Sequence, residues 1–209
     1  MNTKLLYPLG FLMIAGLVAE QILSQPALSQ QKAKDVEITL VSYAVTRSAY
    51  EKIIPKFVAK WQKEKGQKVT FKQSYGGSGS QTRAVIDGLR ADVVQLALES
   101  DVDKIQKAGL IQSGWQKESP NKSIVTKSVI ALVTRAGNPQ KIKGWSDLAR
   151  PEIKTITANP QTSGVASWNF LGLWGSVTQT GGNDAKAREF TTKVYNNVPV
   201  LPKDAREAS

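Results

Sequence analysis

Two short turns rich in serine and glycine carry the residue types in this chain that most clearly suggest chemistry. Each turn follows a predicted strand and opens a predicted helix; the turns are residues 74–80 and 159–164. Backbone N–H groups at the start of a helix lie at the positive end of the helix dipole and bind anions. Neither turn contains a lysine or a carboxylate. The pair therefore predicts one oxyanion held from two sides by neutral donors.

The residue types that the chain lacks exclude most catalytic chemistry, because it contains no histidine and no cysteine. The first turn approaches the nucleophile elbow Gly-x-Ser-x-Gly around Ser78, but Ser80 replaces the last glycine and no histidine can accept the serine proton. The turn also lacks the Gly-Lys-Ser/Thr of a nucleotide phosphate loop. A zinc site would need carboxylates alone. We therefore expect no enzyme activity, no cofactor and no metal site.

The first residues predict export. Lys4 precedes an apolar run over residues 5–18, and the small residues Ala27 and Ser29 have the spacing of a signal peptidase site. The alternative is a membrane anchor, but the run falls short of the ~20 apolar residues that a spanning helix requires. We predict a signal peptide over residues 1–29 and a mature protein in the periplasm. Its removal takes away Lys4 and Glu20, so the net charge stays at +11.

The basic net charge suits an anionic ligand, with a solvated surface as the alternative. Lysines and arginines are interspersed with acids, as at residues 63–65 and 186–189, and no basic block contains interleaved aromatics. This pattern argues against nucleic acid as a partner.

The elements that position the first turn alternate between strand and helix. The β-branched segment Val36–Tyr43 predicts a strand, and an apolar stripe over residues 50–61 predicts a helix whose stripe belongs to the core. A strand at residues 69–71, the first turn, a helix and an apolar strand at residues 92–98 follow. This order predicts an α/β lobe with a parallel sheet, whose ligand lies beyond the carboxyl ends of the strands. Asp92 is interpreted as structural, as is Asp101 farther along.

A second series of elements begins after residue 126. It comprises strands at 128–134 and 155–158, a short helix at 145–149, a helix after the second turn and a helix at 185–195. We place a lobe boundary near Thr126, which gives a first lobe over residues 30–126 and a second over 127–209. The second lobe contains too few strands for a sheet covered on both faces, so we expect it to be incomplete.

Several motifs together resemble one family. They are residues 41–47 (Val-Ser-Tyr-Ala-Val-Thr-Arg), 73–79 (Gln-Ser-Tyr-Gly-Gly-Ser-Gly), 85–89 (Val-Ile-Asp-Gly-Leu), 91–94 (Ala-Asp-Val-Val), 137–139 (Gly-Asn-Pro) and 162–164 (Thr-Ser-Gly). They closely resemble the periplasmic sulfate/thiosulfate-binding proteins of ABC importers, over residues 36–209. The resemblance implies a type II periplasmic-binding-protein-like fold with two α/β lobes and parallel-rich sheets. It also implies delivery of sulfate to an ABC permease in the inner membrane.

The resemblance also implies a set of sulfate-binding residues. They are the backbone N–H of Ala44, the hydroxyls of Ser78 and Ser163, the backbone N–H groups of Gly164 and Val165, and the backbone N–H near Ala205. One turn alone would favour ordinary helix capping by Ser78 or Ser163, whereas two turns together with the resemblance favour the anion site. Sulfate carries no proton at neutral pH and only accepts hydrogen bonds. A site of donors without carboxylates therefore favours sulfate over phosphate, which retains a proton at that pH. Molybdate, another tetrahedral dianion, stays open.

Two features depart from the family pattern. Val165 stands where the family usually has glycine, and Ser167 where it has arginine. Family members also continue well beyond residues 202–208, whereas this chain ends at Ser209. The resemblance therefore implies a truncated protein with impaired sulfate binding. The alternatives are a remnant that binds nothing, or one half of a split protein that assembles with a separate C-terminal half.

Overall fold

The computed structural model describes residues 34–209. The predicted signal peptide, residues 1–29, lies outside the described residues. Within residues 34–209 no helix combines the length and apolar character needed to cross a membrane.

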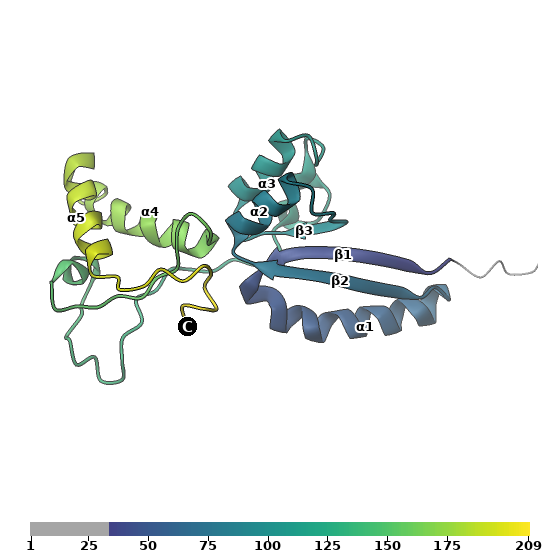
Figure 1. The fold of residues 1–209 in the computed structure, drawn as a ribbon, viewed down its shortest axis with the longest axis horizontal. Helices are drawn as coiled ribbons and strands as arrows, with labels where there is room; N and C mark the ends of the chain where they lie inside the picture. The colour runs from purple at the N-terminus through teal and green to yellow at the C-terminus, as the bar shows by residue number, and fades with distance from the viewer. Residues whose placement is uncertain (1–33) are drawn as a thin grey trace, which may run out of the picture. The chain divides into compact units, whose positions relative to one another are not determined.

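Three parallel strands form one sheet in the order β2-β1-β3 (Figure 1). The central strand β1 (Val36–Tyr43) pairs with β2 (Val69–Gly76) along its whole length. Strand β3 (Val93–Gln95) pairs with the last part of β1 and is shorter than the strand predicted over residues 92–98. Because the strands are parallel, their carboxyl ends meet at one edge of the sheet. The α/β fold with a parallel sheet is therefore confirmed.

Helices cover both sides of this sheet. Helix α1 (Arg47–Lys65) runs along one side, and α2 (Ser78–Ile86) and α3 (Glu99–Lys107) lie on the other (Figure 1). A buried core of Val41, Val85 and Ile105 joins β1 to α2 and α3. Asp92 has the structural role expected of it, since its carboxylate accepts the N–H of Thr39 at 2.7 Å and so joins the start of β3 to β1.

The apolar stripe of α1 is less buried than predicted. No residue of the helix is buried, and the side chains of Ile53 and Phe57 are 54% and 37% exposed. The ring of Phe57 packs edge-on against that of Phe71 in β2, with 5.9 Å between ring centroids. Part of the apolar stripe of α1 therefore packs against the sheet, while the rest of the stripe is exposed to solvent.

The rest of the described chain consists of helices joined by long irregular segments. Its elements are η2 (Trp115–Lys117), η3 (Asn121–Ser123), η4 (Trp145–Ala149), α4 (Gly164–Thr178) and α5 (Asp184–Asn196), and a three-residue helix η1 (Ala44–Thr46) follows β1. The short helix at 145–149 and the helix at 185–195 are thereby confirmed. A second core of Leu148, Ile153, Leu173 and Val194 holds η4, α4 and α5 together.

The strands predicted at residues 128–134 and 155–158 are wrong. Neither range is a strand, although the N–H of Thr155 donates to the Asn197 carbonyl at 3.2 Å. In the first range Val129 is 87% exposed and Val133 is 92% exposed. A strand requires a continuous ladder of hydrogen bonds to a neighbouring strand. Among residues 34–209, the range 155–158 has only the bond from Thr155, and residues 128–134 have no backbone hydrogen bond of this kind. The lobe boundary near Thr126 and the division into two lobes stay predictions.

Candidate functional site

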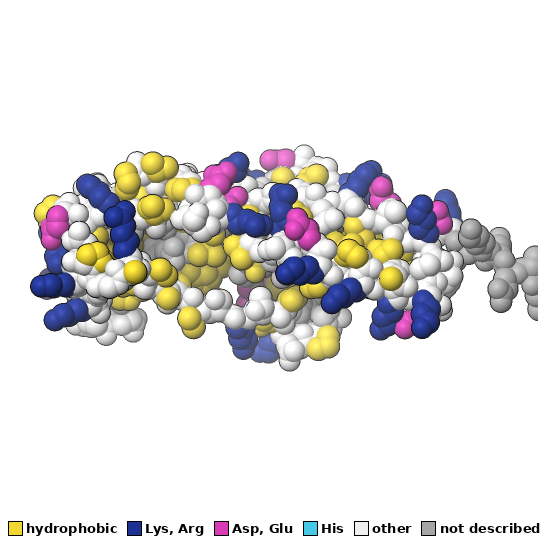
Figure 2. All heavy atoms as spheres, turned by 90° about the horizontal axis from the view of Figure 1, so that it is seen from below, with side chains coloured by type: hydrophobic (Ala, Val, Ile, Leu, Met, Phe, Trp, Pro, Cys, Tyr) yellow, Lys and Arg dark blue, Asp and Glu magenta, His cyan; other side chains and the backbone are white. Residues whose placement is uncertain are grey.

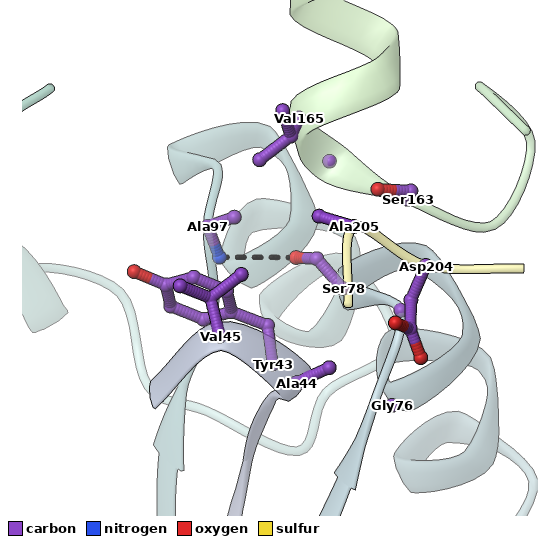
Figure 3. Close-up of a pocket in the computed structure, with 12 residues that line it drawn as sticks. Tyr43, Ala44, Val45, Gly76, Ser78, Ala97, Ser163, Val165, Asp204 and Ala205 are labelled. Carbon is purple, nitrogen blue, oxygen red and sulfur yellow. Dashed lines mark hydrogen bonds between the residues drawn. The ribbon is translucent and has the colours of Figure 1, made fainter. Parts of the chain in front are cut away.

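Both serine/glycine turns border one small cavity near the carboxyl end of the sheet (Figure 3). Its volume is about 210 Å³, counting the space open to solvent. The lining residues come from five stretches of chain: Tyr43, Ala44 and Val45; Gly76, Gly77 and Ser78; Ala97; Ser163, Gly164 and Val165; Asp204 and Ala205. The structure thus brings together all six residues predicted from the sequence.

The first contribution comes from the end of β1. Ala44 is the first residue of η1, and Tyr43 before it is still extended, with φ −83° and ψ 153°. Only 7% of Ala44 is exposed. The first N–H groups of a helical turn have no partner within that turn, so the Ala44 N–H is available to a ligand.

The first turn places Ser78 at the start of α2. Gly77 is the extended N-cap residue, so Ser78 itself is not the cap. The Ser78 hydroxyl donates to a carboxylate oxygen of Asp101 at 2.7 Å. The same hydroxyl oxygen accepts the N–H of Ala97 at 3.0 Å (Figure 3). Because a hydroxyl has a single proton, this one has none left for an anion. The predicted hydroxyl contact is therefore corrected: the donor that Ser78 can offer the cavity is its backbone N–H.

Asp101 is a supporting residue that the sequence argument did not connect with the turn. The residue is 2% exposed, and its second carboxylate oxygen accepts a hydrogen bond from the ammonium of Lys104 at 2.9 Å. Its interpretation as structural agrees with these contacts. No signal in the sequence ties it to Ser78, which lies 23 residues earlier.

The second turn places Ser163 at the N-cap of α4. Its side chain makes no capping hydrogen bond, so the capping alternative does not apply to this residue. Among residues 34–209 its hydroxyl has no hydrogen-bond partner, although only 4% of the residue is exposed. The helical hydrogen-bond pattern of α4 starts with the N–H of Ser167, which donates to the Ser163 carbonyl at 3.1 Å. The N–H groups of Gly164 and Val165 precede this bond and are free for a ligand.

Val165 fits the geometry that the site requires. It lies in the first turn of α4 and is not among the residues with positive φ. Its side chain is 38% exposed. The isopropyl group therefore has room beside the cavity, while the helical backbone keeps the direction of its N–H.

Asp204 is a lining residue that the sequence analysis missed. One carboxylate oxygen accepts the N–H groups of Arg206 at 2.9 Å and Glu207 at 3.2 Å, and the residue is 6% exposed. In the view of Figure 3 the carboxylate points away from Ser163. Neither serine/glycine turn contains a carboxylate, but Asp204 directly precedes Ala205, and this adjacency was the sequence signal for it.

Close backbone packing joins the turns. A Cβ added to Gly77 would meet the Thr162 carbonyl oxygen at 2.3 Å and that of Lys203 at 2.9 Å. The N–H of Ser80 donates to the same Thr162 carbonyl at 3.3 Å, and the Thr162 hydroxyl donates to the Lys203 carbonyl at 2.6 Å. The three segments around the cavity are thus held together, and glycine at 77 permits their approach.

Charge near the site is modest. Among residues 34–209, Asp204 is the only acidic or basic residue that lines the cavity. Burial raises the pKa of the Tyr43 hydroxyl, so this lining residue is neutral at pH 7. On the face drawn in Figure 2, lysines and arginines are scattered among acidic and apolar side chains rather than gathered in one stripe.

A fold with a parallel sheet and a cavity at the carboxyl ends of its strands is the arrangement expected of a ligand-binding α/β protein. The family described as bacterial extracellular solute-binding protein matches residues 38–208. The chain belongs to this family.

Similar proteins carry a more specific name. A sulfate-binding protein of Synechococcus elongatus is 67% identical over 174 residues, which are 83% of this chain and 50% of the relative. One of Synechocystis is 67% identical over 172 residues, 82% of this chain and 49% of the relative. The solved structure of the sulfate-binding protein SubI from Mycobacterium tuberculosis matches with a TM-score of 0.72 and 38% identity, over 83% of this chain and 59% of SubI.

These matches confirm the family resemblance inferred from the motifs and the binding-protein fold. The chain spans about half the length of the curated relatives it matches.

Proposed function

We propose that this protein captures sulfate or thiosulfate in the cavity between its two serine/glycine turns. It then delivers the anion to an ABC permease in the inner membrane. The observation that carries the proposal is the convergence of the helix starts at Ser78 and Gly164 on one cavity that also contains the unpartnered hydroxyl of Ser163.

The proposed ligand set differs in one atom from the set expected from the sequence. The donors are the Ser163 hydroxyl and the backbone N–H groups of Ala44, Ser78, Gly164, Val165 and Ala205. Helices α2 and α4 both begin at the cavity, so both dipoles favour a negative charge there. A site made of donors suits an anion that only accepts hydrogen bonds.

Asp204 makes hydrogen phosphate the most informative competitor. A carboxylate repels a dianion, yet it can accept the proton that hydrogen phosphate retains at neutral pH. One of its oxygens already accepts two backbone N–H groups, which reduces its capacity as an acceptor. We therefore expect sulfate to be preferred over phosphate, by a smaller margin than a site without any carboxylate would give.

Export and partners belong to the same proposal. A periplasmic location through a signal peptide over residues 1–29 follows from the sequence pattern, as does the expectation of no catalysis. The second candidate is one half of a split binding protein that functions together with a separate C-terminal half.

Isothermal titration calorimetry of the purified chain tests the proposal. Sulfate, thiosulfate, molybdate and hydrogen phosphate are titrated in turn at low ionic strength. Saturable 1:1 heat with sulfate or thiosulfate, weaker with hydrogen phosphate, supports the proposed function. No heat at millimolar sulfate contradicts it for this chain by itself, and the same titration with a C-terminal half present then tests the second candidate.

A further inference from the structure

One face of helix α1 carries a strip of basic side chains. Lysines occur at positions i, i+4, i+8 and i+11 of the helix, and at 3.6 residues per turn these positions lie on the same face. The four residues, which we call the α1 basic strip, are Lys52, Lys56, Lys60 and Lys63, and all are exposed. The whole helix contains six basic and two acidic residues, so its net charge is +4.

The positive charge of the strip is largely unpaired. Among residues 34–209, only Lys60 of the four lysines forms an ion pair, with Glu64 at 3.9 Å. Both side chains of this pair are mostly exposed, and an exposed ion pair contributes little free energy. Lysines are rarely buried unless they are paired, so this face of α1 belongs to the protein surface.

Exposed apolar side chains adjoin the basic strip. Ile53 follows Lys52 and Phe57 follows Lys56, and Ile53 and Phe57 are 54% and 37% exposed. Residues 53, 57 and 60 have the i, i+4, i+7 spacing of one helix face, so the apolar and basic groups form a continuous surface. Figure 2 views the molecule from the side on which α1 lies in Figure 1, and basic and apolar side chains lie next to one another there.

This combination of groups indicates the chemistry of a partner. Lysines attract an anionic surface, and exposed apolar side chains favour the partly apolar region just below lipid headgroups. Nucleic acid fits less well, because base stacking requires a free aromatic ring. The ring of Phe57 is stacked on Trp61 at 5.6 Å and packs edge-on against Phe71. A second copy of a chain with net charge +11 would be repelled.

The attachment of α1 to the sheet limits how deep such a contact can be. The packing of Phe57 against Phe71 holds the helix on β2, so its apolar stripe cannot turn as a whole into a bilayer. Ile53 and the exposed part of Phe57 are the apolar groups available for insertion. The contact is therefore peripheral, depends mainly on charge and weakens with salt.

We propose that the α1 basic strip, together with Ile53 and Phe57, docks the protein reversibly on a membrane surface rich in anionic phospholipids. None of these residues lines the anion cavity. The docking surface is thus separate from the proposed anion site and does not depend on which anion that site binds.

Co-sedimentation of the purified chain with lipid vesicles tests the proposal. One set of vesicles contains equal parts of phosphatidylglycerol and phosphatidylcholine, and the other contains phosphatidylcholine alone. We expect at least tenfold tighter binding to the anionic vesicles at low ionic strength, and loss of this difference at about 0.5 M salt. The neutral vesicles also measure any binding through the apolar run at residues 5–18, which is the same in every variant. Sulfate is left out, so a failed sulfate titration does not affect this result.

Removing charge from the strip should weaken docking. The triple variant Lys52→Gln, Lys56→Gln, Lys63→Gln neutralises three exposed lysines that form no ion pair among residues 34–209. Because each lysine near an anionic membrane adds to the attraction, we expect at least tenfold weaker binding to the anionic vesicles. Sulfate titration of this variant should match that of the unaltered chain.

A second triple variant is the matched control for charge. Lys107→Gln, Lys117→Gln, Lys186→Gln removes the same charge from exposed lysines outside α1. It should change vesicle affinity less than threefold. Circular dichroism checks that all variants fold.

A further pair of variants tests the apolar contact. Ile53→Gln should weaken binding to the anionic vesicles about threefold or more, because it removes the most exposed apolar side chain beside the strip. Leu110→Gln alters an apolar residue of similar exposure, 56%, that lies after α3, and it should leave vesicle binding unchanged.

Three outcomes would overturn the proposal. The first is no difference between anionic and neutral vesicles, and the second is an equal loss of affinity in the two triple variants. The third is tighter binding to double-stranded DNA than to the anionic vesicles, with Ile53→Gln unaltered in both, which would identify the strip as a general polyanion site.

Discussion

The hydroxyl of Ser78 donates a 2.7 Å hydrogen bond to the buried carboxylate of Asp101. Asp101 in turn accepts a hydrogen bond from Lys104, and the N–H of Ala97 donates to the Ser78 oxygen. The first residue of α2 is thus fixed by its side chain, which leaves its backbone N–H as the group that can meet an anion. Asp101 therefore positions the start of a helix that we propose holds the ligand.

Replacing Asp101 by asparagine should weaken this arrangement. Asp101→Asn removes a buried charge that pairs with Lys104 and accepts the Ser78 proton, so we expect a loss of about 1–3 kcal/mol in unfolding free energy. Sulfate affinity should fall because the start of α2 is less well fixed. Urea unfolding and calorimetry measure the two effects. Asp87→Asn, an exposed carboxylate at the end of α2, is the matched control, and equal effects in the two variants would contradict the positioning role.

Ser163→Ala should separate binding from stability. The hydroxyl has no partner among residues 34–209, so its removal should hardly change the unfolding free energy. Loss of one hydrogen bond to a charged ligand costs about 1.5–3 kcal/mol, which is a ~10- to 100-fold loss of sulfate affinity.

Ser167→Ala is the comparison variant for Ser163→Ala. The Ser167 hydroxyl donates to the carbonyls of Pro160 at 2.8 Å and Ser163 at 3.3 Å. Its removal should therefore lower stability more than affinity. If Ser163→Ala binds sulfate as the unaltered chain does, the hydroxyl is not a ligand.

The sequence predicted the elements whose patterns are local. The β-branched run of β1 and the helical spacing in α1 and α5 depend on residues within one element. The place of the two serine/glycine turns was also predictable, because a turn that follows a strand and opens a helix lies at the ligand-binding edge of a parallel sheet. Ala44 and Ala205 were implied only by the family resemblance.

What depends on distant partners could not be predicted from local pattern. Residues 128–134 have strand composition, but composition does not specify whether a neighbouring strand is present. The Ser78 hydroxyl was assigned to the ligand because its true partner, Asp101, lies on another helix. Asp204 was not predicted as a lining residue, because it lies in a third segment that only the tertiary fold brings to the cavity.

Gly77→Ala should disturb the cavity through packing. The new methyl group would lie 2.3 Å from the Thr162 carbonyl oxygen, a backbone atom that cannot rotate away. The segments must therefore separate, at a cost of about 1–3 kcal/mol in unfolding free energy. Sulfate affinity should fall as well, since the second turn carries Ser163. Thermal unfolding and calorimetry measure both effects.

Gly175→Ala is the matched control for Gly77→Ala. No atom lies within 4 Å of a Cβ added at Gly175 in α4, and alanine is favoured over glycine inside a helix. We expect this variant to be as stable as the unaltered chain or more stable. Similar losses of stability in both variants would mean that the contact with Thr162 does not limit the choice of residue at 77.

Asp147 should make folding stability depend on acidic pH. Hydrogen bonds from the backbone N–H groups of Lys143 and Gly144 hold the pKa of its carboxyl below the ordinary value of 3.8. A carboxyl whose pKa is lower in the folded state stabilises the fold above its unfolded pKa, and this contribution is lost as the pH falls through the folded pKa. The urea midpoint of the unaltered chain should therefore decrease below about pH 4.

Asp147→Asn should be less stable than the unaltered chain at pH 7, and its urea midpoint should change less with pH in the acidic range. The control is Glu118→Gln, which removes an exposed carboxylate without a hydrogen bond among residues 34–209 and should keep the pH dependence of the unaltered chain. If the urea midpoints of Asp147→Asn and of the unaltered chain change in parallel between pH 2.5 and 7, the Asp147 carboxyl does not link folding to proton binding. A carboxyl with a shifted pKa must change the slope of stability against pH in the range where it titrates.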